Sequence, residues 1–599
     1  MPATYRAPVK DTLFVLQHVV QLDKYRNLPG FADAGDDMVR AILEEGAKFV
    51  EGVVHPLNQV GDREGCTRHD DGSVTTPTGF KAGYAAFVEG GWGTLMAPKA
   101  YGGQGLPHVI GSAFEEYLAS ANMAFSMYPG LTMGAVSAIH VAASDEQKNR
   151  YLPNMISGKW TGTMNLTEPH CGTDLGLIRT RAEPAADGSW KVTGTKIFIS
   201  SGEHDLAGNI IHLVLAKTPG APDNVKGISL FIVPKFLVND DGSPGARNSL
   251  SCGSIEHKMG IHGNATCVMN YDGATGFLVG EEMKGLKAMF IMMNVARLGV
   301  GMQGLAQSEI AYQNAAAYAR DRLQGRALTG PKNPEGKADS LLVHPDVRRM
   351  LLDARAFNEG ARALSLWASL QADLSHAAAT PEEREAADDL LSLLTPVIKA
   401  WMTDEGYAHA TNAQQIFGGH GYIAEWGMEQ FVRDARIAMI YEGANGIQAL
   451  DLVGRKLAMN GGRGLRTFLA LLDSAIADAG ADERVKGHAE ALAKAKGRLE
   501  AATMWLMQNG MTNPDNAGAG ATAYLRLLAL VTFGWLWLVM ERAALAGEAD
   551  GGEFGADFML AKQMTARHFF ERQLPATSGL LAAVQAGAGT LMAFPDSAF

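Results

Sequence analysis

The chain has 599 residues, of which 47% are hydrophobic and 19% are charged, a balance typical of a folded protein with several cores. Its formal net charge of −12 argues against binding to nucleic acid, because contacts to phosphates need concentrated Lys and Arg. Its four cysteines (Cys66, Cys171, Cys252, Cys267) form no CxxC pair, so we expect free thiols in a reducing compartment and no metal site.

Residues 36–160 are predicted to be mostly helical. The start of the chain lacks the basic residues and long apolar run of a signal peptide, so we expect a cytoplasmic protein. Residues 1–35 are interpreted as an N-terminal extension and residues 36–160 as a helical domain. Within that domain Ile42 to Val53 carries helically spaced apolar residues, and Ser144 followed by Gln147 is typical of a capping box.

Residues 161–285 change character and predict a middle β domain. Trp190–Ser200 alternates between polar and apolar residues, while Ile210–Ala216 and Ile228–Val233 are short apolar runs separated by Gly, Pro and Asn. Strands do not alternate with helices, and no GxGxxG motif follows a strand. A doubly wound dinucleotide-binding sheet is therefore disfavoured.

Helical patterns return in residues 286–457, and Gly461, Gly462 and Gly464 suggest a linker into a further helical domain at 458–599. The most apolar stretch, Leu527–Met540, is shorter than the roughly 20 residues needed to cross a bilayer. We expect a buried core helix and no transmembrane segment, the alternative being an interfacial or partner-facing helix.

Three segments could carry chemistry, although each alone also reads as an ordinary loop. Residues 164–174 pack Thr, Gly and backbone donors into one turn, which suits a planar heterocycle or an anion. Residues 415–422 hold three glycines that permit close approach of a ligand, and His420 there reads better as a hydrogen-bonded structural residue than as a ligand. Residues 440–448 place Glu442 beside apolar Ile440, where desolvation would raise its pKa toward that of a general base.

These segments occur in order among the motifs GGWGTLMAPKAYGGQGLP, LTEPHCGTD, KIFISSGEHD, HKMGIHGNATC, NVARLGVGMQGLA, YARDRLQGRAL, QQIFGGHGY and RDARIAMIYEGANGIQ. From about Gly90 to Gln448 the set resembles the acyl-CoA dehydrogenase family. The resemblance implies an α+β, mostly α fold with an N-terminal helical domain, a middle β-barrel-like domain and a C-terminal four-helix bundle, here followed by an additional helical domain. Both chain ends resemble the long bacterial branch that includes 3-methylmercaptopropionyl-CoA dehydrogenases.

The resemblance also implies roles for individual residues. Glu442 matches the catalytic base, while Ala296 stands where some members place that base instead. Residues matched to FAD binding are Met164, Leu166, Thr167, Phe198, Ser200, Arg322, Gln324, Gln415, Gly418, Gly419 and Asn445. Residues matched to the acyl-CoA substrate are Thr173, Asn294, Arg297 and Gly443.

Two departures from the family pattern affect the expected flavin contacts. Gly325-Arg326 replaces the usual Phe-Gly, and Ala444 replaces a Thr that gives FAD one hydrogen bond. Arg322 and Gln324 match residues that hold the FAD pyrophosphate of a neighbouring subunit. The resemblance therefore implies a homo-oligomer. Because the long branch is similar to members that are dimers, we expect a homodimer.

The implied reaction is the FAD-dependent α,β-dehydrogenation of an acyl-CoA thioester to the trans-2-enoyl-CoA. Glu442 would remove the α-proton, the β-hydride would pass to flavin N5, and an electron-transfer flavoprotein would reoxidise the flavin. A 3-methylmercaptopropionyl-CoA and medium- or long-chain acyl-CoAs all stay open as substrates. The alternatives are an acyl-CoA oxidase and a non-catalytic flavin-bearing scaffold or DNA-protection protein.

Overall fold

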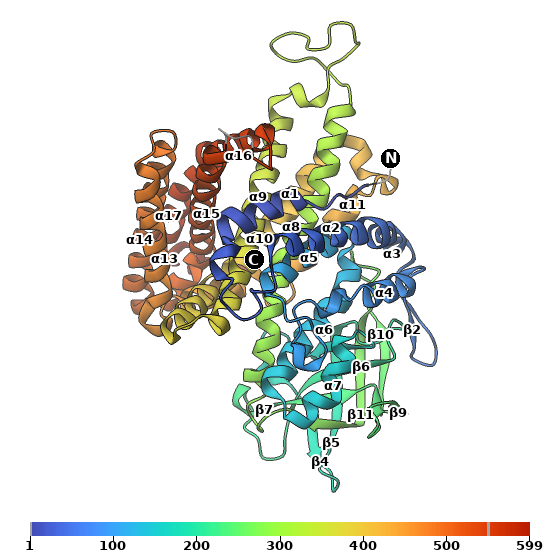
Figure 1. The fold of residues 1–599 in the computed structure, drawn as a ribbon. Coiled ribbons are helices and arrows are strands. Elements are labelled where there is room, and N and C mark those ends of the chain that lie inside the picture. Colours follow the sequence, from blue (N-terminus) through green and yellow to red (C-terminus); the bar gives the residue numbers. More distant parts are fainter. Residues whose placement is uncertain (1–2, 548–551) are drawn as a thin grey trace. The chain divides into compact units, whose positions relative to one another are not determined.

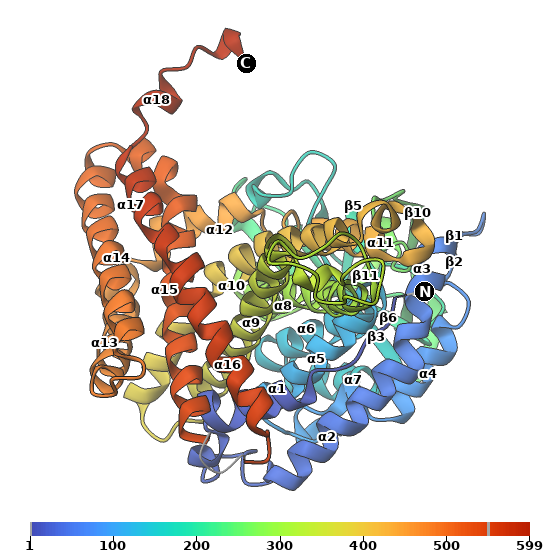
Figure 2. The same ribbon diagram turned by 90° about the horizontal axis from the view of Figure 1, so that it is seen from above.

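The computed structural model describes residues 3–547 and 552–599, and the chain divides into two compact units (Figures 1 and 2). The helical unit comprises Met1–Ala47, Pro107–Ser120 and Val300–Phe599. The sheet unit comprises Lys48–Leu106 and Ala121–Gly299. Helix α8 (Gly285–Asp321) contributes residues to both units.

The sheet unit contains the strands of the predicted β domain. They are β1 (Thr67–Arg68), β2 (Val74–Thr75), β3 (Trp160–Asn165), β4 (Arg181–Pro184), β5 (Trp190–Ser200), β6 (Asn209–Lys217), β7 (Ile228–Pro234), β8 (Phe236–Val238), β9 (Pro244–Arg247), β10 (Leu250–Ile255) and β11 (Thr266–Leu278). Strands β5, β6 and β7 confirm the three strands predicted from alternation and apolar runs. The hairpin of β1 and β2 lies in the region predicted to be mostly helical.

Five of these strands close into a ring. The strands β11, β5, β4, β6 and β7 are each hydrogen-bonded to the next, and β7 pairs with β11 again. Strand β10 adds to β11 on one side, and β3 runs parallel to β6 on the other. This closure confirms the predicted barrel-like middle domain and leaves few free strand edges.

Strand β6 is buried on both faces, which explains why its sequence is an apolar run. Its Leu213 packs in a cluster with Ile139 and Leu152, whereas its Val214 packs with the ring residues Phe231 and Met269. A strand buried on both sides loses the alternation that an exposed face would impose.

Four helices complete the described part of the sheet unit together with the start of α8: α3 (Asn58–Glu64), α4 (Phe80–Glu89), α6 (Met123–Ala142) and α7 (Asp145–Ile156). Helix α7 begins with the predicted capping box. The Ser144 side chain accepts the Gln147 N–H at 3.2 Å, and the Gln147 side chain accepts the Ser144 N–H at 3.1 Å. The cap supplies partners for two N–H groups that a helix start leaves unpaired.

The helical unit contains the remaining helices. They are α1 (Val9–Val15), α2 (Asp36–Phe49), α5 (His108–Ala121), the second half of α8, α9 (Pro345–Ala377), α10 (Pro381–Ile416), α11 (Met428–Ala438), α12 (Asn445–Asp451), α13 (Arg463–Gly480), α14 (Lys486–Thr512), α15 (Pro514–Gly547), α16 (Ala556–His568), α17 (Thr577–Gln585) and α18 (Gly589–Met592). The order of a helical bundle followed by further helices confirms the predicted fold class.

Helices α8 and α10 approach closely because both carry glycine at their contact. A Cβ on Gly304 would lie 2.2 Å from the Met402 carbonyl oxygen, and a Cβ on Gly406 would lie 2.2 Å from the Gly304 carbonyl oxygen. Any side chain at either position would push the two backbones apart.

Helix α15 contains the apolar stretch Leu527–Met540, whose side chains are largely buried within the helical unit. By length and composition alone, two described helices could cross a membrane: α15, with 83% of its apolar window buried, and α8, with 50%. The burial of α15 confirms the prediction of a core helix.

Six charged side chains meet inside the helical unit; we call them the buried ion cluster. The cluster consists of the carboxylates of Asp11, Glu116, Glu309 and Glu359 with the cations of Arg362 and Lys562. The Arg362 guanidinium lies 2.6 Å from Glu116 and 3.0 Å from Glu309. Asp11 lies 2.5 Å from both Arg362 and Lys562, so it links them. The cluster thereby joins α1, α5, α8, α9 and α16.

Candidate active site

The end of β3 and the loop that follows it carry three of the predicted cofactor residues, Met164, Leu166 and Thr167. Met164, Leu166 and Thr167 are half-buried, and Thr173 is exposed further along the loop. The loop closes on itself at its centre, because the backbone of Glu168 and that of Cys171 exchange hydrogen bonds of 2.9 and 3.1 Å. The bridge between Glu168 and Cys171 therefore separates Leu166 and Thr167 at the start of the loop from Thr173 near its end.

A buried ion pair holds this loop on strand β5. Lys196 Nζ donates to Glu168 Oε1 at 2.8 Å and to the Leu166 carbonyl oxygen at 3.0 Å. Glu168 also accepts the N–H groups of Arg179 and Thr180 at 2.7 and 3.0 Å. Burial raises the pKa of Glu168, but Lys196 and these hydrogen bonds outweigh it, so the pKa of Glu168 lies below its usual value.

The same strand carries Phe198 and Ser200. Phe198 has a φ of +58° and is 59% exposed. A left-handed conformation is strained for an aromatic residue, and such strain clusters at functional sites. The neighbouring Ile197 N–H donates to the Thr167 carbonyl oxygen at 2.9 Å, so the backbone beside Phe198 is fixed to the loop that carries Thr167 and Glu168. Ser200 is half-buried, and its carbonyl oxygen accepts the Thr163 hydroxyl at 3.3 Å.

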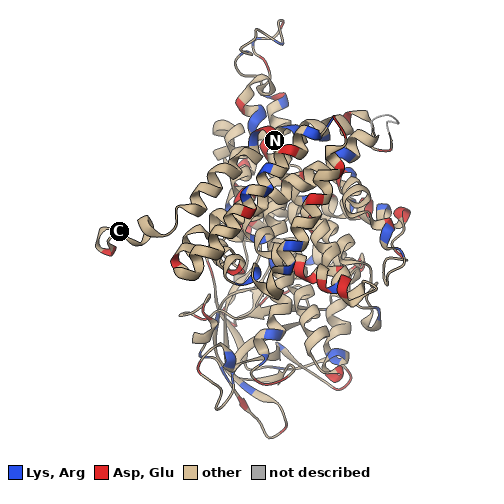
Figure 3. Cartoon of the chain, turned by 90° about the vertical axis from the view of Figure 1, so that its left-hand side faces the viewer, with Lys and Arg blue, Asp and Glu red and all other residues tan. Residues whose placement is uncertain are grey.

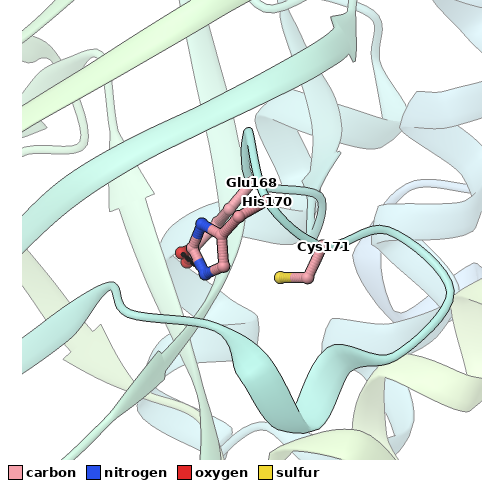
Figure 4. A group of neighbouring side chains, drawn as sticks. All are labelled: Glu168, His170 and Cys171. Carbon is pink, nitrogen blue, oxygen red and sulfur yellow. Dashed lines mark ion pairs between the residues drawn. The ribbon is translucent and has the colours of Figure 1, made fainter.

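Glu168, His170 and Cys171 bring three potential metal ligands within 4.8 Å of one another (Figure 4). The Glu168 carboxylate is already saturated by Lys196 and backbone N–H groups. His170 Nε2 is hydrogen-bonded to the Leu177 carbonyl oxygen at 2.8 Å. Glu168 and His170 are thus held by hydrogen bonds within the protein, and these bonds account for their closeness to Cys171. We therefore assign no metal to this group.

Helix α8 contributes the predicted substrate residues Asn294 and Arg297 to the sheet unit. Asn294 is exposed, whereas Arg297 is only 8% exposed and its guanidinium lies 5.9 Å from the centre of the Phe290 ring. Ala296 between them is half-buried and has no ionisable group.

Glu442 lies in the helical unit, in the turn between α11 and α12. It is half-buried and has a φ of +56°, the left-handed region that costs a residue with a Cβ about 1 kcal/mol. The Tyr441 hydroxyl donates to the Gln303 side chain on α8, which fixes the start of the turn. Burial and the neighbouring Glu442 charge both raise the pKa of Tyr441, so this hydroxyl keeps its proton.

Gln448 and Asn445 fix the rest of the Glu442 turn. Gln448 Nε2 donates to the carbonyl oxygens of Glu442 and Gly443 at 3.1 and 3.4 Å. The Asn445 side chain accepts Lys399 Nζ at 2.8 Å and donates to Asp404 at 2.7 Å, both on α10. Helix α12 begins at Asn445 without a side-chain cap, because Ala444 at the cap position has no hydroxyl.

Gly443→Ala is expected to displace the Glu442 turn, and a shift of about 1 Å would lower kcat/KM about 10²-fold if Glu442 acts as the predicted base. Gly443 has a φ of +87°, and a Cβ there would lie 2.6 Å from Gln448 Nε2. The matched control is Gly446→Ala, where nothing lies within 4 Å of the added Cβ. If steady-state kinetics gave the same kcat/KM for both variants, the Gln448 hydrogen bonds to the Glu442 turn would have no role in catalysis.

The predicted cofactor residues Gln415, Gly418 and Gly419 are exposed at the end of α10. No atom lies within 4 Å of a Cβ built on either glycine, so the surface is open there. His420 is hydrogen-bonded to the Tyr318 hydroxyl at 2.9 Å, as expected for a structural residue. Phe417 stacks on the same Tyr318 ring with centroids 4.1 Å apart, which anchors the glycine turn on α8.

Arg322 and Gln324 are exposed just beyond the end of α8. An antiparallel bridge between Leu323 and Ser340 fixes their backbone. The structure also explains why Gly325-Arg326 can replace the usual Phe-Gly of the family. The Arg326 guanidinium donates to the carbonyl oxygens of Asn333, at 2.8 Å, and Gly336, and so closes the loop that the bridge begins.

Asp339 is the fully buried centre of that loop. Its carboxylate accepts the N–H groups of Ala327, Lys332 and Asn333 at 2.7 to 2.9 Å. These hydrogen bonds, led by that from Ala327, lower the pKa of Asp339. Arg326 therefore serves this loop of its own chain.

Sequence reasoning missed the pairing of Glu168 with Lys196. A signal was present, because Lys196 lies four residues after the buried Val192, so alternation places both side chains on the same face of strand β5. A charge at an inward position needs a buried partner of opposite sign. The sequence alone does not say which of the acidic residues that partner is.

Known families match the chain along most of its length. Four family models match in succession: the acyl-CoA dehydrogenase N-terminal domain at residues 37–159, its middle domain at 163–274, its C-terminal domain at 283–458, and an acetyl-CoA dehydrogenase C-terminal-like domain at 468–595. Among solved structures, Caenorhabditis elegans ACDH-11 in complex with C11-CoA has a TM-score of 0.78 at 17% identity, covering 96% of this chain and 92% of that one. The acyl-CoA dehydrogenase of Bacillus anthracis complexed with FAD has a TM-score of 0.73 at 21% identity, covering 94% and 90%.

Curated relatives extend the similarity to sequence. The 3-methylmercaptopropionyl-CoA dehydrogenase of Ruegeria pomeroyi is 44% identical, over 95% of this chain and 96% of its own length. A butyryl-CoA dehydrogenase of Syntrophomonas wolfei is 35% identical, over 99% of each chain. The broad-specificity linear acyl-CoA dehydrogenase FadE5 of Mycobacterium tuberculosis is 34% identical, over 99% of this chain and 100% of its own. The chain therefore belongs to the acyl-CoA dehydrogenase family of oxidoreductases.

Proposed function

We propose that the chain dehydrogenates an acyl-CoA thioester between Cα and Cβ, with Glu442 as the base that removes the α-proton. The observation that carries this proposal is the Glu442 turn. The backbone of Glu442 has a strained left-handed conformation, and Gln448 holds it by a hydrogen bond to its carbonyl oxygen. Tyr441 and Asn445 fix the two ends of the turn to α8 and α10. A loop that only connected two helices would need no such set of tethers.

FAD is the cofactor of this family, and the described residues fit it. Phe198 offers an exposed aromatic face next to the Glu168–Lys196 loop, which suits a planar ring system. Gly418 and Gly419 leave open backbone at the end of α10 that suits close approach of a phosphate or ribityl chain. When bound, FAD accepts the hydride that leaves the substrate β-carbon.

The chain's own residues supply the proton chemistry. The α C–H of a thioester is a weak acid, so its removal needs a carboxylate whose position is already fixed. Glu442 takes this proton and the product leaves as the trans-2-enoyl-CoA. The N–H of Glu442 would donate to the thioester carbonyl oxygen and stabilise the negative charge that develops there.

The remaining site residues are proposed to contact FAD, to contact the acyl-CoA or to position the site. Met164, Leu166, Thr167 and Ser200 would line the flavin, and Arg322, Gln324 and Gln415 would bind its pyrophosphate. Thr173, Asn294, Arg297 and Gly443 would lie along the acyl-CoA. Asn445 would act as a positioning residue, because its side chain is engaged by α10 rather than presented to a ligand.

The substrate we propose to try first is 3-methylmercaptopropionyl-CoA, with medium- and long-chain acyl-CoAs beside it. The 44% identical relative supports the former, and the butyryl-CoA and broad-specificity linear enzymes support the latter. An electron-transfer flavoprotein is the proposed electron acceptor, and a homodimer the proposed assembly, both from the family resemblance.

The test is a panel of these thioesters assayed with an electron-transfer flavoprotein or a ferrocenium acceptor. We expect enoyl-CoA to form in step with acceptor reduction for a subset of the panel. Release of peroxide with no added acceptor would identify an oxidase instead. Absence of enoyl-CoA from every thioester, with FAD bound, would refute the proposed activity.

Lys196→Met is expected to reduce the FAD content of the purified protein at least about tenfold. Removing one partner of a buried ion pair costs about 3–5 kcal/mol, and here the cost falls on the loop that carries Met164 to Thr173. The measurement is flavin absorbance per polypeptide, together with the apparent Kd for added FAD.

Two further variants separate positioning from general damage. Lys191→Met removes an exposed lysine of the same strand, which donates to Thr275, and should leave FAD content unchanged. Glu168→Leu combined with Lys196→Met removes both charges and should restore stability without restoring FAD binding. Normal FAD affinity in Lys196→Met would show that the pair does not position the flavin loop.

A further inference from the structure

The end of the described chain forms an exposed apolar arm. Residues 589–599, which we call the arm, are all exposed and include Leu591, Met592, Phe594 and Phe599 at 62%, 66%, 48% and 93%. Figure 2 shows the arm, with α18 on it, leading away from α14, α15 and α17 of its own unit. No charged residue occurs from Gln573 to Pro595.

A second exposed apolar surface lies on α14. Met504, Met507 and Met511 share one face of this helix, at spacings of three and four residues, and are 55%, 60% and 87% exposed. We call these three residues the methionine stripe. The surrounding segment 501–514 carries no charge, and Figure 3 shows the arm in tan except near the C label.

The arm leaves the unit beside the methionine stripe. The Ala588 N–H donates to Asn516 Oδ1 at 3.0 Å, and Ala588 is buried. A Cβ on Gly587 would lie 3.4 Å from the ring of Trp505, which follows Met504 on α14. Gly587 has a φ of +66°, so the backbone turns outward at this point instead of continuing α17.

We propose that the arm of one copy packs on the methionine stripe of a second copy, and that the exchange is reciprocal. Both surfaces are largely apolar, the methionine stripe lies in a segment without charge, and Asp596 is the only charged side chain of the arm. Within the described residues of one copy neither surface covers the other. Flexible methionine side chains adapt well to leucine, methionine and phenylalanine side chains. The arm begins after Ala588, beside the stripe of its own copy. A two-fold axis near Ala588 would therefore bring each arm onto the stripe of the other copy.

The dimensions allow the exchange. With α18 (Gly589–Met592) kept helical and the other seven residues extended, the arm reaches about 29 Å. The stripe from Met504 to Met511 spans only about 10 Å along its helix. The arm can therefore cross to a neighbouring copy and still cover the whole stripe.

The test is a cross-link between two variant chains that carry different affinity tags and are expressed together. One chain carries Leu591→Cys on the arm, and the other carries Met507→Cys on the stripe. Both side chains are more than half exposed, so neither substitution removes core packing. Mild oxidation of the purified full-length protein is expected to give a disulfide-linked species that carries both tags.

The control pair is Leu591→Cys with Met564→Cys, since Met564 is 49% exposed on α16, outside the stripe. We expect at least about a tenfold lower yield of the doubly tagged species from this pair. Equal yields from the two pairs, or none from the first pair, would overturn the proposal. A single chain carrying Leu591→Cys and Met507→Cys that cross-links only within itself would overturn it as well, since the arm would then fold back on its own stripe.

Discussion

Glu442→Gln is expected to lower turnover of acyl-CoA between about 10² and 10⁴-fold, while FAD stays bound. The amide has almost the same shape as the carboxylate but cannot accept the α-proton. The turn should persist, because Gln448 bonds to the Glu442 carbonyl oxygen rather than to its side chain. Tyr441 and Asn445 likewise tie the turn to α8 and α10 without using the Glu442 carboxylate.

The measurements are kcat with the best thioester and the flavin absorbance per polypeptide. Glu425→Gln is the matched control, because Glu425 is an exposed carboxylate between α10 and α11. Its kcat should equal that of the unsubstituted enzyme. If Glu442→Gln kept most of its turnover, another group would have to be the base. Loss of FAD together with activity would point to a structural role for the carboxylate.

Arg362→Met is expected to lower the free energy of unfolding of the helical unit by about 3–5 kcal/mol. Arg362 is 1% exposed and contacts the carboxylates of Asp11, Glu116 and Glu309. Its removal leaves Asp11 with Lys562 as a partner, whereas Glu116 and Glu309 lose their cation in the ion cluster. Buried charges without compensation are far more costly than a missing surface ion pair.

The measurement is urea-induced unfolding followed by circular dichroism, with Arg349→Met as the control. Arg349 lies on the same helix, is about half exposed, and pairs with Asp346 and Asp353. Surface pairs of this kind contribute less than about 1 kcal/mol. If the two variants unfolded at the same urea concentration, the buried ion cluster would not be what fastens α1 and α16 to α9.

Sequence patterns predicted the elements that depend on local spacing. The alternation at Trp190–Ser200 gave β5, and the apolar runs gave β6 and β7 within one residue at each end. The Ser144 capping box was also predicted, because both of its partners lie within four residues. Leu527–Met540 was predicted as a core helix from its length and composition, and its burial confirms this.

The features that sequence reasoning missed depend on pairing between distant residues. The pair of Glu168 and Lys196 spans 28 positions, and that of Arg362 with Asp11 spans 351. Sequence shows that such charges exist but not which ones meet. Arg326 was recognised as a departure from the family pattern, yet its role in closing the 326–339 loop depends on contacts with Asn333 and Gly336. The individual roles predicted for the site residues remain predictions.

The most direct test of the central claim is an anaerobic titration of the purified holoenzyme with acyl-CoAs of graded length and with 3-methylmercaptopropionyl-CoA. The readout is the oxidised flavin band near ~450 nm. We expect rapid bleaching by a subset of these thioesters in the unsubstituted enzyme and at least about 10²-fold slower bleaching in Glu442→Gln. FAD-loaded enzyme that none of the thioesters bleached, or equal bleaching rates in the two proteins, would contradict it.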